Sequence, residues 1–194
     1  MSELLAVGID PSLRAFGMAK VRIDLRKLTF RVVDVRLTET ELDHSKQVRK
    51  GSDDLRRCRE VITSLREFTS DVAFGFAEVP SGGAQSASAL KALSMATAFL
   101  GACPAPLIEV QPSEVKLATV GRRTASKPEM IAWAIAKHPE AAWMTRKLHG
   151  KIEHIAKNEH IADAICAVYA GLRTEQFRQA VAMFGGRVDL EDLL

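Results

Sequence analysis

The sequence predicts an α/β protein built on a mixed sheet of five strands, three antiparallel followed by parallel ones, with helices flanking the sheet. Three runs of strand character follow one another closely in the first 37 residues and predict an antiparallel meander. The two later apolar runs each follow a long segment of helical period, which provides the crossover that a parallel strand requires. Two of the runs end at a carboxylate, so one edge of the predicted sheet is a candidate functional site.

The strands and helices are predicted from the spacing of apolar residues. The predicted strands cover residues 4–10, 16–23, 28–37, 72–78 and 107–110, and the polar segment 38–52 is predicted as a loop. The predicted helices cover residues 53–69, 85–102, 112–119, 127–137 and 159–172. Ser52 or Asp53 is the expected cap of the first helix. Leu90, Leu93, Ala96 and Leu100 lie on one side of the second helix, which is expected to pack in the core or also against a second copy of the chain.

Two segments have weak periodicity. Residues 138–158 are basic, with Gly150 near their middle, and we interpret them as a long, mobile surface connection in which His149 and His154 are surface residues. After Thr174 the pattern fades into a short helix and a frayed tail. We therefore expect one domain, residues 1–173, followed by a C-terminal extension, residues 174–194.

Composition excludes several classes of protein. With 47% hydrophobic and 26% charged residues, the chain has the composition of an ordinary globular protein, and it has no apolar run near the roughly 20 residues of a membrane span. The N-terminus lacks the pattern of a signal peptide, which predicts a cytoplasmic location. Cys58, Cys103 and Cys166 are odd in number and isolated, so neither a disulfide framework nor a zinc site is expected.

The candidate site consists of three carboxylates and a histidine. Asp10 and Glu78 end two strands that we expect to be parallel neighbours, and His160 and Asp163 share one helix face because they are three residues apart. Each carboxylate alone could equally be a turn or strand-end residue. Together they suit a pair of divalent cations about 4 Å apart that promote in-line phosphoryl transfer. Carboxylates and imidazole suit Mg²⁺ or Mn²⁺.

Positive charge is concentrated in one part of the chain. Residues 112–157 carry nine Lys or Arg and four Glu, although the whole chain has a net charge of only +3. A basic block beside a carboxylate cluster suits a polyanionic substrate. Taken alone, such a block is more often a solvated surface.

Several ordered motifs resemble the RuvC family of Holliday-junction resolvases, which have the ribonuclease-H-like fold. The resemblance covers about residues 4–172. Its motifs are Gly8-Ile9-Asp10-Pro11-Ser12 with Gly17, the strand-end Glu78, Ser88-Ala89-Leu90-Lys91, Val115-Lys116, Lys127 behind Ala125-Ser126, and His160-Ile161-Ala162-Asp163-Ala164. The loop after Glu78 lacks the aromatic residue of bacterial members, segment 138–158 looks like an insertion, and the chain after 173 is extra. The sequence therefore resembles the divergent resolvases of bacteriophages more than the bacterial housekeeping members.

The resemblance implies a crossover junction endodeoxyribonuclease that cuts four-way junctions by two-metal-ion hydrolysis of phosphodiester bonds, with forks and flaps as further expected substrates. It implies two Mg²⁺ per active site, replaceable by Mn²⁺, bound by Asp10, Glu78, His160 and Asp163, with Lys116 and Lys127 as the two catalytic lysines at the scissile phosphate. A homodimer is expected, because two matched cuts need two sites, and helix 85–102 is the candidate interface. The expected DNA contacts are Arg14, Ser81, Arg122, Arg123, Arg146, Lys147 and Lys151.

Two other functions remain open. One is a catalytically silent protein that binds branched DNA through the basic block. The other is a phosphotransferase of the actin and sugar-kinase type, because those chains also open with an Asp after a strand and a Gly seven residues later. Such kinases need a second Asp-Gly phosphate-binding turn and a larger second half, and the 194 residues contain neither.

Overall fold

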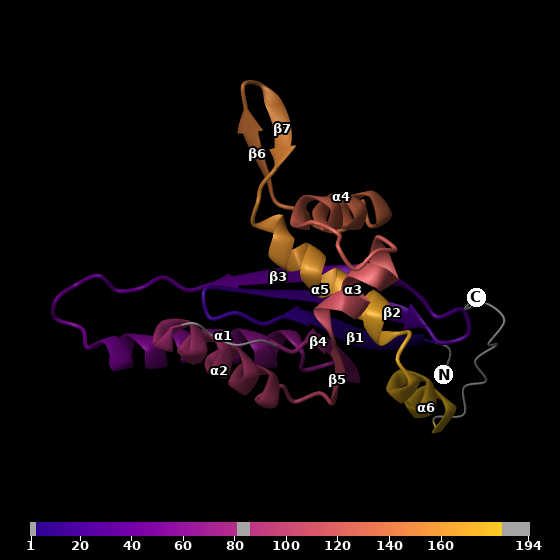
Figure 1. Cartoon of the computed structure of the whole chain (residues 1–194), viewed down its shortest axis with the longest axis horizontal. Helices are drawn as coiled ribbons and strands as arrows, with labels where there is room; N and C mark the ends of the chain where they lie inside the picture. The colour runs from indigo at the N-terminus through magenta and orange to yellow at the C-terminus, as the bar shows by residue number, and fades with distance from the viewer. Residues whose placement is uncertain (1–2, 81–85, 184–194) are drawn as a thin grey trace.

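The computed structural model describes residues 3–80 and 86–183 and contains a mixed sheet with helices on both faces (Figure 1). The strands of the main sheet are β1 (Glu3–Asp10), β2 (Ala15–Asp24), β3 (Thr29–Glu39), β4 (Phe74–Glu78) and β5 (Leu107–Val110). The helices are α1 (Lys50–Phe68), α2 (Ala87–Gly101), α3 (Pro112–Thr119), α4 (Lys127–Lys137), α5 (Asn158–Gly171) and α6 (Glu175–Met183). A separate hairpin is formed by β6 (Thr145–Leu148) and β7 (Lys151–His154).

The predicted mixed sheet is confirmed. Its strand order is β3-β2-β1-β4-β5, with β1, β2 and β3 antiparallel and with β1, β4 and β5 parallel. In Figure 1, α1 and α2 lie below the sheet, α3 and α5 cross in front of it, and α4 lies above it. The bounds of α3, α4 and β5 agree with those predicted, since each is set by local signals: a Pro in the first turn of both helices and a short apolar strand.

The two faces of the sheet have different partners. Along β1, Val7 and Ile9 belong to a core with Val61 and Leu65 of α1. Ala6, whose side chain points to the other face, belongs to a core with residues of α5. Because side chains alternate along a strand, Gly8 and Asp10 share the face of Ala6. Asp10 is therefore on the side of the sheet that α5 covers.

Helix α5 lies directly on this face because glycines leave room for its backbone. A Cβ placed on Gly8 would be 1.9 Å from the carbonyl oxygen of Ala164, and one on Gly17 would be 2.3 Å from that of His160. Gly17 lies opposite Asp10 in the β1–β2 register. The glycines of two adjacent strands thus set the distance between the sheet and the helix that carries His160 and Asp163.

Helix α6 adds to the same core. Phe177 is fully buried, and its ring packs edge to face against Phe76 of β4 with ring centroids 5.3 Å apart. The division between a domain and an extension at residue 173 remains a prediction, and the expected tail after residue 183 lies outside the described residues. No helix within residues 3–80 and 86–183 is long and apolar enough to span a membrane.

The predicted cap of α1 was wrong. The helix begins after Arg49, whose backbone is extended, rather than after Ser52 or Asp53. Asp53 is only 3% exposed, and its carboxylate instead accepts hydrogen bonds from Arg56 and from the backbone N–H of Asp43. These long-range and side-chain contacts decide the role of Asp53, and the local sequence pattern does not reveal them.

Of the two expectations for α2, core packing holds only for its second half. Leu90 is 57% exposed, whereas Ala96, Phe99 and Leu100 are buried. The ring of Phe99 packs against Phe16 of β2, with centroids 6.0 Å apart. Only the C-terminal half of α2 buries its apolar residues, so the first half leaves part of its apolar side exposed.

Residues 145–154 of the predicted surface connection are exposed, His149 and His154 included, but the prediction missed a hairpin within it. Strands β6 and β7 pair in an antiparallel ribbon across the turn residues His149 and Gly150. Both turn residues have positive φ, 46° and 78°, as a two-residue hairpin turn of the favoured twist requires. All eight strand residues are exposed, so the segment shows no alternation of apolar and polar residues that would have predicted it.

We expect Gly8→Ala to lower the free energy of unfolding by about 2 kcal/mol or more, because the added methyl group pushes against the backbone of α5. Gly51→Ala is the control, since a Cβ there meets nothing within 4 Å. The control should leave stability unchanged or raise it by roughly 0.5–1 kcal/mol, as expected for Gly to Ala in a helix. Urea unfolding measures both, and equal midpoints for Gly8→Ala and the parent would contradict the close-packing argument.

Candidate active site

Asp10 and Glu78 are neighbours at the edge of the sheet. The parallel register pairs Ile9 with Ala77, so the next residue of each strand lies at the same edge and on the same face. The pKa of Glu78 is raised by burial and by the negative charge of Asp10. The register therefore places the two strand-end carboxylates, far apart in the sequence, at neighbouring positions.

Helix α5, which covers this face of the sheet, contributes His160 and Asp163 to the site. His160 Nδ1 is 2.7 Å from Oδ2 of Asp10. Asp163 lies one turn further along the helix, and its pKa is raised to about 7 by burial and by the charges of Asp10 and Glu78. The structure thus brings together the four side chains that the sequence pattern selected.

His160 interacts with two carboxylates. Its pKa is raised chiefly by the hydrogen bond with Asp10, while burial acts in the opposite direction. Its Nε2 is 3.5 Å from Oε1 of Glu159. A protonated His160 would balance part of the negative charge of the site, and Nδ1 would then donate to Asp10.

The two predicted lysines also lie around these carboxylates. Lys116 is on α3, Lys127 begins α4, and the positive charges of both lower the pKa of Glu78. Lys127 acts in the same way on Asp163. The lysines are therefore within electrostatic range of the carboxylates, as charge partners of a phosphate at this edge would have to be.

Sequence reasoning missed Glu159. Its carboxylate lies between Lys127 Nζ, 3.4 Å from Oε2, and the His160 ring. Glu159 precedes His160 in the sequence and stands in the first turn of α5, where an acidic residue is commonly explained by the helix dipole alone. The sequence therefore gives no sign that Glu159 also contacts both Lys127 and His160.

The donor chemistry of the site fits a divalent cation. Carboxylate oxygens and an imidazole nitrogen are ligands of Mg²⁺ and Mn²⁺. The pKa values of Glu78 and Asp163 are raised first by burial and then by the negative charges of their neighbours, so a bound cation would favour the ionised carboxylates. However, within residues 3–80 and 86–183 no three His, Cys, Asp or Glu side chains are arranged to hold a metal ion as they stand.

The residues predicted to contact DNA are dispersed over the surface around this edge. Arg14 follows β1 and is exposed, and Arg122 and Arg123 are exposed in the connection between α3 and α4. Arg122 forms an ion pair with Glu129. Arg146, Lys147 and Lys151 are exposed on the β6–β7 hairpin. Ser81 lies outside the described residues.

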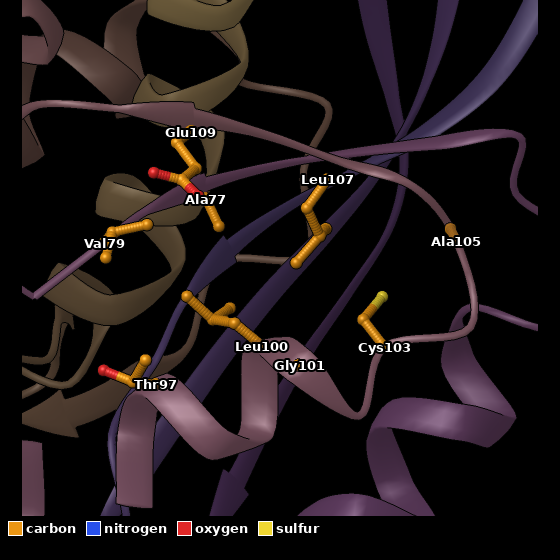
Figure 2. A pocket seen from close by; sticks show the side chains of 9 residues that line it. All are labelled: Ala77, Val79, Thr97, Leu100, Gly101, Cys103, Ala105, Leu107 and Glu109. Atoms are coloured by element: carbon orange, nitrogen blue, oxygen red, sulfur yellow. The ribbon is translucent and has the colours of Figure 1, made fainter. Parts of the chain in front are cut away.

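The cavity in Figure 2 is separate from the carboxylates. It has a volume of about 370 Å³ and lies between α2, which supplies Thr97 and Leu100, and the strand residues Ala77 and Leu107. Ala77 and Val79 flank Glu78 in the sequence, so they point to the opposite face of the sheet. The cavity is therefore on the α1–α2 side, and we assign it no part in the chemistry.

We expect Asp163→Asn to stabilise the metal-free protein at pH 8 by about 1–3 kcal/mol. The folded-state pKa of Asp163 is about 7 against an ordinary value of 3.8, so folding favours the protonated carboxyl. The ionised carboxyl consequently costs stability, and this cost develops as the pH rises from about 4 to above 7.

Thermal unfolding of the parent and the variant in a chelator, at pH 5 and pH 8, measures this cost. The gain should be larger at pH 8 than at pH 5. Glu109→Gln, at an exposed carboxyl, should give no pH-dependent gain. A parent protein as stable as Asp163→Asn at pH 8 would show that the carboxylates do not repel one another as described.

Comparison with known proteins identifies the fold. No family model and no curated protein matches the sequence. Among solved structures, Thermus thermophilus RuvC in complex with a Holliday junction substrate is similar with a TM-score of 0.61 and 18% identity, over 86% of this chain and 92% of that one. A second Thermus thermophilus RuvC structure gives a TM-score of 0.55 and 19% identity, over 94% and 98%. The chain therefore has the ribonuclease-H-like fold of RuvC, as the sequence motifs predicted.

Proposed function

We propose that this protein is a metal-dependent endonuclease that cuts four-way DNA junctions, and other branched DNA, by hydrolysing phosphodiester bonds. The observation that carries the proposal is the cluster of Asp10, Glu78, Asp163 and His160 at one edge of a RuvC-like sheet. Phosphodiester hydrolysis needs groups that hold hard cations beside a phosphate, and closely spaced carboxylates are such groups. The RuvC fold supports this function, because one similar structure contains a Holliday junction substrate.

Each side chain has a proposed role. Asp10, Glu78, Asp163 and His160 are the proposed ligands of two Mg²⁺ ions, which Mn²⁺ could replace. When bound, such ions supply an activated water and stabilise the leaving oxygen. Lys116 and Lys127 are proposed to face the scissile phosphate and offset the charge that develops on it. Their effect on the pKa of Glu78 supports this placement.

The basic surface around the carboxylate edge is the proposed site for the arms of the junction. Arg14, Arg123, Lys147 and Lys151 are exposed there, and phosphate contacts from such residues are independent of sequence. Arg122 and Arg146 already form ion pairs, with Glu129 and Glu153 respectively, so we expect them to contribute less. We propose recognition by charge and branch shape.

We further propose a homodimer, because resolving a four-way junction requires two matched cuts and each chain has one carboxylate cluster. Helix α2 is the proposed interface. Its first half is exposed, including Leu90, and it contains many small residues that permit close approach. It also lies on the opposite side of the sheet from α5, so pairing through α2 would leave both carboxylate clusters free.

We expect Asp10→Asn, Glu78→Gln and Asp163→Asn each to abolish cutting of a four-way junction in Mg²⁺, while binding of the junction is kept or slightly tightened. Each change removes a negative charge that faces the phosphate, so affinity should not fall. A nicking assay on branched and linear DNA, with a parallel binding assay, tests this. A parent protein that binds but does not cut in Mg²⁺ or Mn²⁺ would favour a silent binding protein. A variant that cuts at the parent rate would refute the proposed cluster.

We expect Lys116→Ala and Lys127→Ala each to lower the single-turnover cleavage rate at saturating protein, because a cation beside the phosphate stabilises the transition state. Lys137→Ala is the control, since Lys137 is exposed at the other end of α4. An effect confined to affinity and its salt dependence would place Lys116 and Lys127 on the general binding surface instead.

A further inference from the structure

The β6–β7 hairpin projects from the body of the protein between α4 and α5 (Figure 1). Every residue of both strands is exposed, and the ribbon carries Arg146, Lys147 and Lys151 against one acidic residue, Glu153. A two-stranded hairpin is only marginally stable by itself in water. Its exposure and charge therefore need an explanation other than packing.

The base of the hairpin is fixed to the active-site helix. Asn158, the first residue of α5, is fully buried, and its side chain exchanges two hydrogen bonds with the backbone of Met144, at 3.0 and 2.8 Å. The backbone N–H of Ile155 donates to the carbonyl of Met144 at 3.3 Å. Asn158 is two residues before His160. The ribbon is thus anchored where α5 begins, beside the carboxylates.

The two faces of the ribbon differ. Directly opposed residues of an antiparallel pair point to the same side, and the sides alternate along each strand. The register pairs Lys147 with Ile152 and Thr145 with His154, which together make one face. The other face carries Arg146 paired with Glu153, with Arg146 Nη2 and Glu153 Oε2 3.6 Å apart, and Leu148 opposite Lys151. The face of Lys147 and Ile152 has no acidic residue.

Protection against aggregation does not account for this arrangement. Lysines on open strand edges do discourage pairing with other strands. Yet Ile152 is 77% exposed, and a protective surface would not place a large apolar side chain beside Lys147. A cation next to an apolar group fits a DNA groove, where Lys meets phosphates or guanine and an apolar group meets the thymine methyl.

The size of the hairpin matches the major groove of duplex DNA. Strands of four residues extend about 13 Å, whereas the major groove is about 12 Å wide and 8.5 Å deep and admits a two-stranded ribbon. The undistorted minor groove is about 6 Å wide, so a ribbon could enter it only if the duplex were bent and the groove widened. We infer that the hairpin lies in the major groove of one duplex arm of the bound DNA with its Lys147–Ile152 face turned inward, so that Lys147 meets a phosphate at the groove wall and Ile152 meets the base edges. The inference rests on the proposed function in that branched DNA is the ligand.

Excision of the hairpin tests the inference most directly. Met144 and Ile155 already have the hydrogen bond of residues that flank a two-residue turn, so residues 145–154 can be replaced by Asn-Gly without disturbing the base. Binding of a labelled four-way junction is measured in a chelator, so that no cutting occurs. We expect at least tenfold weaker binding at 0.1 M salt, and a smaller slope of log affinity against log salt.

Single substitutions distinguish the two faces. Lys147→Ala should reduce the salt slope by about 0.9, the value for one phosphate contact, and Arg146→Ala should reduce it by less than half as much. Ile152→Ser should weaken binding several-fold with no change in slope, because it removes an apolar contact. Met183→Ser, at a residue 87% exposed on α6, is the control and should leave affinity unchanged.

Three outcomes would overturn the inference. The first is unchanged affinity after excision, with an unfolding midpoint equal to that of the parent. The second is equal effects of Lys147→Ala and Arg146→Ala. The third is loss of a dimer on sedimentation after excision while Lys147→Ala and Ile152→Ser bind normally, which would assign the hairpin to a second copy of the chain. Failure of the parent to cut in Mg²⁺ would refute the proposed nuclease but not these binding differences.

Discussion

The contact between α5 and the sheet is the constraint on which the rest of the structure depends. Gly8 and Gly17 let the backbone of α5 approach two adjacent strands so closely that a single added Cβ would collide with a carbonyl oxygen of the helix. This approach brings His160 to within 2.7 Å of Asp10 and places Asp163 in the field of both strand-end carboxylates. It also fixes the start of α5, where the hairpin is anchored through Asn158. A larger separation would leave the four side chains too far apart to act on one phosphate.

The resulting cluster is electrostatically strained. Glu78 and Asp163 both have raised pKa values because burial and neighbouring negative charge disfavour ionisation. This negative charge is offset only in part, through the hydrogen bond between His160 and Asp10 and through the positive charges of Lys116 and Lys127. Strain of this kind is a cost to folding that a site tolerates when the charges are needed for function. Glu159 links Lys127 with His160, so the cations and anions around the cluster form one connected arrangement.

Because side chains alternate along β1 and β4, the two faces of the sheet carry different groups. Asp10 and Glu78 face α5, whereas Ile9, Ala77 and Val79 face α1 and α2, where the cavity of Figure 2 lies. The carboxylates and the hairpin are thus on one side, and the exposed first half of α2 is on the other. This division is compatible with DNA binding on the first side and self-association on the second, because neither surface would obstruct the other.

The sequence by itself determined the strands of the sheet, helices α3 and α4, and the position of Asp10 and Glu78 at one edge, because these follow from local periodicity, Pro positions and strand register. It also selected His160 and Asp163, since three-residue spacing puts both on one helix face.

Only the tertiary structure decided how close α5 comes to the sheet, and hence the burial that raises the pKa of Asp163 to about 7. It alone revealed the link through Glu159, the role of Asp53 within α1 and the exposure of Leu90. The hairpin was not predicted from the sequence because apolar residues recur at regular spacing only when an element buries one of its faces. Both strands of this ribbon are exposed to solvent on both faces.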